Sequence, residues 1–363
     1  MTLTFVQKIQ FLVIRTIVSI LWLFDVTAYA TFGNRFFSVA KVGAITSLIL
    51  LFSFSLTHRL SAINYVQNVK YLHTGINFYI YGDSTLGSLT PFTENNVLGT
   101  RSVGGVVPVL KETRAFPYIT AKAHLIIDNN SKTILSEHNI KRSFAPASTT
   151  KLMTALVTLD LYKLDEEVKV LQECTLVDST KLWLLEGDTF LVKDFLYSLL
   201  VSSAGDVGCT LAASKVSVEN FVSLMNEKAV NIGMNSTHFT NAIGLDGENG
   251  SHYSSVWDLY ILSEKIMENT LLREIVNTEL YSFTPVNKPK TNVNIENTNK
   301  LLSQIPESIG IKTGRTDGAG EVLIYRYKEL SKDLTIIVMS SDDRFSDTRK
   351  LLDWALESYS WDK

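Results

Sequence analysis

The chain has 363 residues, of which 45% are hydrophobic and 20% charged, and its formal net charge is −3. This composition excludes disorder along most of the chain, and at roughly 100–200 residues per domain the length allows two or three domains with an enzyme-sized core. The charge excludes nucleic acid as the main partner, because neutralising phosphates needs a strongly basic surface. The two cysteines, Cys174 and Cys209, are not spaced as a metal or redox pair. A disulfide between them stays open, but two buried thiols are the favoured interpretation.

The most apolar stretch lies at residues 38–57, which are twenty residues with one charge, Lys41. Roughly twenty helical residues span the ~30 Å hydrocarbon layer, so this stretch is predicted to be a transmembrane helix. Residues 11–32 are also apolar but contain Arg15 and Asp25, and such charges each cost about 2.5–3.5 kcal/mol at the centre of a bilayer helix. This second stretch either spans the membrane or lies along its surface.

Basic residues set the expected orientation of this N-terminal region. They precede or begin the stronger apolar stretch, at Lys8, Arg15, Arg35 and Lys41. The positive-inside rule holds that end in the cytoplasm and places everything after His58 outside. A cleaved secretory signal is the alternative, but its basic end would be unusually long and no clear cleavage site follows. We expect residues 1–58 to be an uncleaved anchor in the cell membrane, either single-pass or two-pass.

Two further domains are predicted after the anchor. Residues 59–113 mix glycine and proline with serine, threonine and asparagine and have no sustained period, which is typical of a linker or stalk. Residues 114–363 form the third domain. It opens with apolar runs at 124–128 and 133–135 around a polar turn, a pattern that predicts a β-hairpin.

The rest of the third domain alternates between helical and strand patterns. Helices are predicted at 148–162, 199–213 and 220–232, strands at 321–325 and 334–339, and a last helix at 348–359. This order predicts an α+β fold in which helices flank an antiparallel sheet and a mostly helical subdomain is inserted.

The first predicted helix opens with a serine and a lysine at chemically useful spacing. Ser148 and Lys151 are three residues apart, so they lie on the same helix face. Serine is a weak nucleophile at neutral pH and needs a base, and a lysine serves when its pKa is lowered by desolvation or by another cation. The spacing alone is a weak signal, because Ser38 and Lys41 share it at the membrane edge.

Two later motifs strengthen this signal. Ser203 begins the sequence Ser-Ala-Gly-Asp after an apolar run, and Lys312, Thr313 and Gly314 lie where the terminal strand region begins. Ser-x-x-Lys, then Ser, then Lys-Thr-Gly, in this order, is the signature of penicillin-binding proteins and serine β-lactamases. From about Phe116 to its end, the chain resembles the low-molecular-mass D-alanyl-D-alanine carboxypeptidases. Further family-like blocks lie at 145–156, 221–229, 233–234, 237–239, 244–245, 252–255 and 297–302.

The resemblance implies a β-lactamase/transpeptidase-like fold and a membrane-anchored serine-type D-Ala-D-Ala carboxypeptidase. Its partners would be peptidoglycan stem peptides ending in D-Ala-D-Ala, with β-lactam antibiotics as covalent inhibitors. Whether water or a second stem peptide accepts the acyl group stays open. No cofactor is implied, and the six histidines contain no His-Glu-x-x-His zinc motif. His252 lies in a family-like block, and we expect a structural role for it.

The resemblance also assigns roles to the matching positions. Ser148 would attack the carbonyl between the two terminal D-alanines to form an acyl-enzyme, and Lys151 would be the base. Ser203 would relay a proton toward the leaving amine. Lys312 would add positive charge that keeps Lys151 neutral and attracts the terminal carboxylate of the substrate.

Substrate binding is expected at the Lys-Thr-Gly motif. Thr313 would hydrogen-bond the terminal carboxylate, and Gly314 would let an extended peptide approach the strand closely. The backbone N–H groups of Ser148 and Arg315 would form an oxyanion hole. Arg344 and Arg349 are both candidates for further carboxylate recognition, and the sequence does not choose between them.

One residue departs from the family pattern. The second motif is Ser-x-Asn in the family, whereas Gly205 occupies the third position here. Loss of that asparagine removes hydrogen bonds at the reacting centre. Three alternatives follow: a water or neighbouring side chain substitutes, turnover is slow, or the domain only binds peptidoglycan. We favour activity, because four catalytic positions remain. A β-lactamase is ranked lower, because the Glu-x-x-Leu-Asn base motif is absent.

Overall fold

The computed structural model describes residues 106–361, which belong to one compact unit of the chain. The predicted anchor at 1–58 and residues 59–105 of the predicted linker lie outside the described part. Within that part, no helix combines the length and the apolar character needed to cross a membrane.

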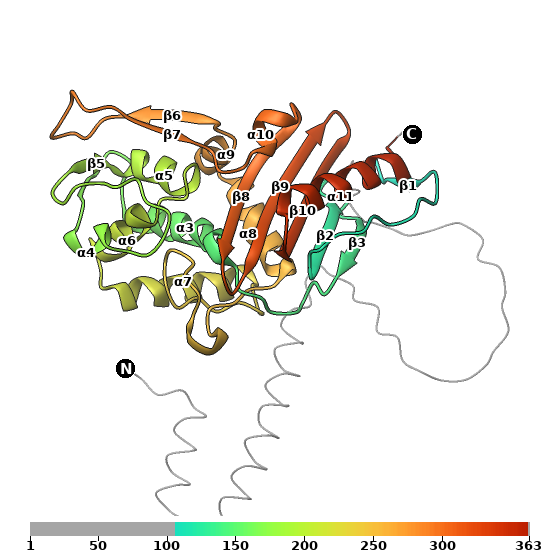
Figure 1. Cartoon of the computed structure of the whole chain (residues 1–363), viewed down its shortest axis with the longest axis horizontal. Helices are drawn as coiled ribbons and strands as arrows, with labels where there is room; N and C mark the ends of the chain where they lie inside the picture. The colour runs from blue at the N-terminus through green and yellow to red at the C-terminus, as the bar shows by residue number, and fades with distance from the viewer. Residues whose placement is uncertain (1–105, 362–363) are drawn as a thin grey trace, which may run out of the picture. The chain divides into compact units, whose positions relative to one another are not determined.

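A five-stranded antiparallel sheet forms one half of the described domain (Figure 1). Its strand order is β3-β2-β10-β9-β8, so the hairpin that opens the domain pairs with strands from the end of the chain. This confirms the predicted hairpin and the predicted terminal strands. The strand bounds are β2 (Ala123–Asp128), β3 (Ile134–His138), β8 (Ser308–Thr316), β9 (Gly320–Glu329) and β10 (Lys332–Ser341).

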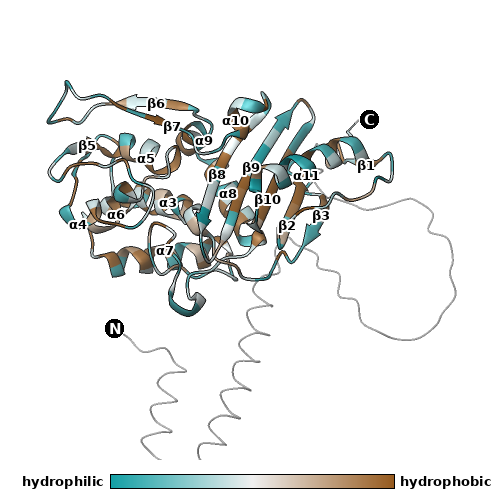
Figure 2. Cartoon of the chain, viewed as in Figure 1, coloured by the Kyte–Doolittle hydropathy of each residue, from teal (hydrophilic) through white to brown (hydrophobic). Residues whose placement is uncertain are grey.

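Hydrophobic residues run along the central strands of the sheet (Figure 2). Consecutive residues of β10 are buried, and successive side chains of a strand point to opposite faces, so both faces of the sheet are covered. On β10, Ile337 belongs to the larger core cluster, which includes residues of α8 (Val256–Glu268). The neighbouring Ile336 belongs to a second cluster, which includes residues of α11 (Arg344–Ser358). The sheet is therefore packed between two helices, as an α+β fold requires.

The helical subdomain is inserted between β3 and β8 (Figure 1). Its helices are η1 (Ala147–Thr150), α3 (Lys151–Leu161), α4 (Gln172–Thr175), α5 (Val192–Leu200), α6 (Gly205–Ala213), α7 (Val218–Ile232), η2 (Glu248–Gly250), α8, α9 (Thr270–Val276) and α10 (Leu301–Gln304). Three small strand pairs complete the described fold: β4 (Glu167–Lys169) with β5 (Thr189–Leu191), β6 (Leu280–Phe283) with β7 (Val293–Glu296), and β1 (Val109–Leu110) with β11 (Tyr359–Ser360).

One helix prediction was wrong in a way that matters for the site. The helix expected at 199–213 is broken, because α5 ends at Leu200 and α6 begins at Gly205. Ser203, inside the break, has a φ of 63°, a left-handed conformation that an α-helix cannot contain. The apolar pattern runs through the break, since Val201 and Ala204 are fully buried, and it therefore hid the interruption.

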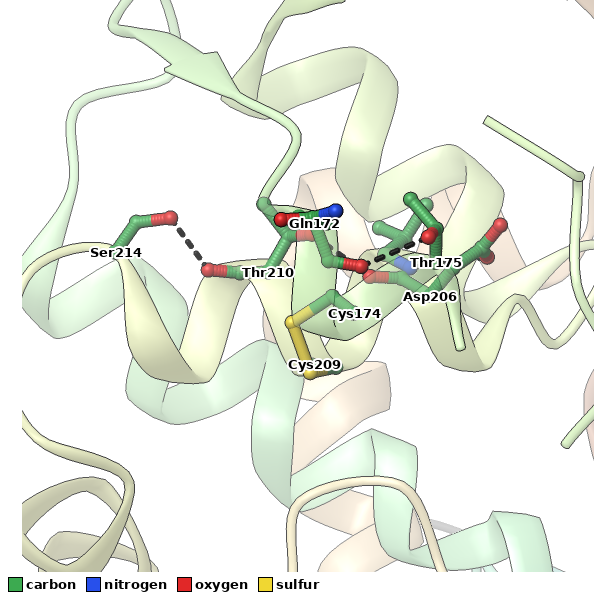
Figure 3. The surroundings of a disulfide bond; sticks show 8 residues. Gln172, Cys174, Thr175, Asp206, Cys209, Thr210 and Ser214 are labelled. Carbon is green, nitrogen blue, oxygen red and sulfur yellow. Dashed lines mark hydrogen bonds between the residues drawn. A yellow bond between two sulfur atoms is a disulfide. The ribbon is translucent and has the colours of Figure 1, made fainter. Parts of the chain in front are cut away.

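The prediction of two buried thiols was also wrong. Cys174 on α4 and Cys209 on α6 form a disulfide, with a Cα–Cα distance of 5.4 Å (Figure 3). They are 35 residues apart in the sequence, and only the packing of α4 against α6 brings them together. Spacing along the chain could not reveal that contact.

Candidate active site

Ser148 and Lys151 form the centre of the site. Ser148 is half-buried in η1, one turn before Lys151, which begins α3 and is completely buried. The Lys151 Nζ lies 2.8 Å from the Ser148 Oγ and donates a second hydrogen bond, at 2.6 Å, to the carbonyl oxygen of Ile243. The structure thus brings the predicted nucleophile and the predicted base into direct contact.

The surroundings of Lys151 suit it to act as a base. Burial lowers its pKa to about 7, and the nearby Asp206 carboxylate, which raises the pKa, offsets only part of that effect. At neutral pH, a substantial fraction of Lys151 is therefore unprotonated and able to accept the Ser148 proton. A base whose pKa lies near the working pH is the most effective.

Two glycines let other segments approach the turn that carries Ser148. A Cβ on Gly314 would lie 2.9 Å from both the Ser148 nitrogen and the Ala147 Cβ, and a Cβ on Gly244 would overlap the Ala147 carbonyl. Ala147 itself has a φ of 48°. Gly314 was expected to make room for a peptide. In the structure, it makes room for the Ser148 backbone, because a Cβ at this position would collide with the Ser148 nitrogen.

Lys312 lies on β8 and is 1% exposed. Burial, together with the positive charges of Lys151 and Arg344, holds its pKa well below the usual lysine value. Within residues 106–361, its one side-chain hydrogen bond goes to the carbonyl of Thr313, at 3.2 Å. These surroundings therefore favour the neutral form of Lys312. The resemblance had led us to expect a positively charged Lys312.

The structure chooses between the two arginine candidates. Arg344 donates from Nη1 to the carbonyl of Gly314, at 2.9 Å, whereas Arg349 is exposed and bonds to Gln304. The Arg344 Nε is buried and has no partner among residues 106–361. Arg344 thus borders the Lys-Thr-Gly motif and retains a free donor. The Thr313 hydroxyl lies 2.6 Å from the Thr298 hydroxyl, so it can accept there and still donate to a ligand.

Comparison with known proteins decides the family. The family model described as D-alanyl-D-alanine carboxypeptidase matches residues 110–343. The chain belongs to this family. This confirms the resemblance inferred from the three motifs.

Individual relatives agree with this assignment. The D-alanyl-D-alanine carboxypeptidase of Streptomyces sp. strain K15 is 29% identical over 269 residues, which cover 69% of this chain and 91% of that protein. DacF of Bacillus subtilis is 28% identical over 249 residues, and the match covers 66% of this chain but only 63% of DacF. Among solved structures, the Streptomyces K15 DD-transpeptidase matches with a TM-score of 0.63 and 28% identity, covering 67% of this chain and all of that one.

Ser203, in the family's second motif, makes no hydrogen bond to Ser148 or Lys151. It is 5% exposed, and its hydroxyl makes no hydrogen bond within the part of the chain that the structure describes. The preceding Val201 carbonyl accepts from the Thr298 N–H at 3.0 Å, which links this loop to the Lys-Thr-Gly strand through Thr313. The structure therefore does not join Ser203 to Ser148 or Lys151 directly.

Asn241 holds the loop that supports Lys151, and sequence reasoning missed it. Its Oδ1 accepts the N–H groups of Ile243, Gly244 and Leu245, at 2.7–3.1 Å. This fixes the Ile243 carbonyl to which Lys151 donates. An asparagine three residues before a glycine is a turn signal that could have pointed to it.

His252 has the structural role that was expected. Its Nδ1 accepts the Thr240 N–H, at 3.0 Å, and its Nε2 lies 2.8 Å from the Thr150 hydroxyl. Burial lowers its pKa to about 4, so it is neutral at pH 7. It joins the loop before Asn241 to the turn that precedes Lys151.

Proposed function

We propose that this chain is a serine-type D-Ala-D-Ala carboxypeptidase that acts through an acyl-enzyme on peptidoglycan stem peptides. The observation that carries the proposal is the 2.8 Å contact between the Ser148 Oγ and a completely buried lysine whose pKa is about 7. Family membership adds the substrate class, since the curated relatives are named for this activity.

During acylation, Ser148 loses its hydroxyl proton and forms an ester with the substrate carbonyl carbon while the peptide C–N bond breaks. Neutral Lys151 takes the hydroxyl proton as the Ser148 Oγ attacks the carbonyl carbon between the terminal D-alanines. The N–H groups of Ser148 and Arg315 stabilise the oxyanion, and the C–N bond then breaks. The leaving amine takes the proton that Lys151 accepted from Ser148, and we propose Ser203 as the relay. Water then cleaves the ester to release the shortened peptide and restore Ser148.

Three side chains are proposed to recognise the terminal carboxylate of the substrate. Arg344 supplies charge beside Gly314, Thr313 supplies a hydroxyl, and Lys312 contributes when protonated. A carboxylate bound here would raise the pKa of Lys312, because it would offset the neighbouring positive charges. Gly314, which has no side chain, would let an extended peptide approach and pair with β8.

The decisive test compares the natural chain with Ser148→Ala. The full chain in detergent is incubated with a fluorescent penicillin and, separately, with a D-alanyl-D-alanine peptide. We expect covalent labelling and D-alanine release, both abolished by Ser148→Ala and both kept by Ser223→Ala, an exposed serine on α7. Absence of both labelling and release in the natural chain would contradict the proposal and favour the peptidoglycan-binding alternative. Labelling without D-alanine release would contradict the carboxypeptidase activity. Rapid hydrolysis of the penicillin would favour a β-lactamase.

We further propose that residues 1–58 anchor the protein in the cell membrane with the catalytic domain outside. The apolar run at 38–57 and the basic residues before it support this. The Cys174–Cys209 disulfide agrees, because disulfides persist in oxidising compartments outside the cytoplasm.

Spheroplasts that express the full chain test the anchor and its orientation. A membrane-impermeant protease should degrade the catalytic domain while a cytoplasmic marker survives. Deletion of residues 1–58 should remove the chain from the membrane fraction. Protection of the domain, or retention of the deleted form in that fraction, would contradict the proposal.

A further inference from the structure

The segment after α4 is fastened to the first turn of α6, next to the second motif. The Gly205 N–H donates to the Thr180 carbonyl, at 2.6 Å. The Asp206 carboxylate accepts the N–H groups of Leu182 and Leu184. The Cys174–Cys209 disulfide ties the start of the segment to the same helix (Figure 3). The segment is therefore held beside Gly205 from several sides.

Ser179, in the middle of this segment, occupies the space that a side chain at residue 205 would enter. A Cβ built on Gly205 would lie 2.5 Å from both the Cβ and the Oγ of Ser179, and 3.2 Å from the Thr180 carbonyl. Real Cβ atoms do not make contacts as short as 2.5 Å. The segment can lie this close only because residue 205 is glycine.

The Ser179 hydroxyl has hydrogen-bonding capacity that the described residues do not use. Ser179 is half-buried, and its hydroxyl makes no hydrogen bond to any residue between 106 and 361. In α4, just before the segment, the Thr175 hydroxyl donates to the Gln172 carbonyl. A hydroxyl can donate one hydrogen bond and accept others, so it suits a peptide amide.

We propose that Ser179 is a substrate-binding residue that supplies the polar contact missing at Gly205. The inference rests on the proposed carboxypeptidase function and names a contact within that site. The hydroxyl binds an amide group of the stem peptide near the scissile bond, from a different segment than the motif itself. One hydroxyl has fewer hydrogen-bonding positions than a carboxamide, so the contact is smaller than the one it replaces.

The first test removes only the hydroxyl. In the full chain, Ser179→Ala should lower kcat/KM for D-alanine release by about tenfold or more, because a hydrogen bond to the substrate is lost. Ser179→Thr should retain most of the activity. Thr180→Ala removes a neighbouring exposed hydroxyl from the same segment and should change kcat/KM less than about twofold. Unchanged melting temperatures would exclude a folding defect.

The second test exchanges the two positions. Gly205→Asn alone should reduce activity, because the new side chain collides with Ser179 and the Thr180 carbonyl. Adding Ser179→Gly opens that space, and the double variant should be more active than Gly205→Asn alone. Full activity of Ser179→Ala, or of Gly205→Asn by itself, would overturn the inference. Penicillin labelling of the natural chain keeps the two proposals apart: its presence supports the enzyme even if Ser179 proves inert.

Discussion

At the scale of single residues, the chemistry depends on the protonation of Lys151. Its pKa of about 7 follows from complete burial, which penalises the ammonium form more than Asp206 stabilises it. The sequence predicted the pair, because residues three apart share a helix face. It could not predict the complete burial of Lys151 or its hydrogen bond to the Ile243 carbonyl, because residue 243 is distant in the sequence.

The rate of acylation should therefore rise with pH. Below pH 7, Lys151 is protonated and cannot accept the Ser148 proton, so kcat/KM should fall by about tenfold per pH unit and level off above about pH 8. Stopped-flow labelling with a fluorescent penicillin measures this profile. Lys141→Gln, which changes an exposed lysine, should leave it unaltered. A flat profile, or one that falls as pH rises through 7, would rule out Lys151 as the base.

Ser179 illustrates what a sequence hides at this scale. The glycine at 205 was visible as a departure, and a substitute side chain was one of the alternatives. The identity of that substitute was not predictable, because Ser179 and Gly205 are 26 positions apart and meet only when the segment after α4 folds onto α6.

At the scale of elements, the site forms where two segments pack closely against the backbone of η1. The turn η1 contacts β8 at Gly314 and the loop after α7 at Gly244. The sequence predicted the helix after Ser148 and the strand at Lys312, but not the contact between them. It also missed the break between α5 and α6, since buried residues continue through it.

Substitutions at two glycines distinguish the effect of a steric clash with a neighbouring segment from the effect of a positive φ alone. Gly244 and Gly233 both have positive φ values, 84° and 91°, but only Gly244 faces other atoms, because nothing lies within 4 Å of a Cβ on Gly233. Gly233→Ala should cost about 1 kcal/mol of unfolding free energy and leave penicillin labelling unchanged. Gly244→Ala should cost more and slow labelling at least tenfold. Urea unfolding measures the loss of stability in each variant, and penicillin labelling measures the acylation rate. Equal effects of Gly233→Ala and Gly244→Ala on these two quantities would contradict the account.

At the scale of the whole molecule, the fold brings together residues from both ends of the domain. Ser148 follows the opening hairpin, whereas Lys312 lies on a terminal strand, and pairing of β2 with β10 joins the two regions in one sheet. The α+β class and the inserted helical subdomain were predictable from the order of the patterns. The strand order was not, because it depends on pairings between distant segments. The domain limits at 58 and 113 and the membrane anchor stay predictions.

The central claim is that Ser148 becomes acylated because Lys151 activates it. The most direct measurement is mass spectrometry of the full chain after incubation with a penicillin, followed by peptide mapping of the adduct. The account predicts one adduct, located on Ser148, which disappears in Ser148→Ala and forms much more slowly in Lys151→Met. An adduct on another residue, or no adduct on the natural chain, would contradict it.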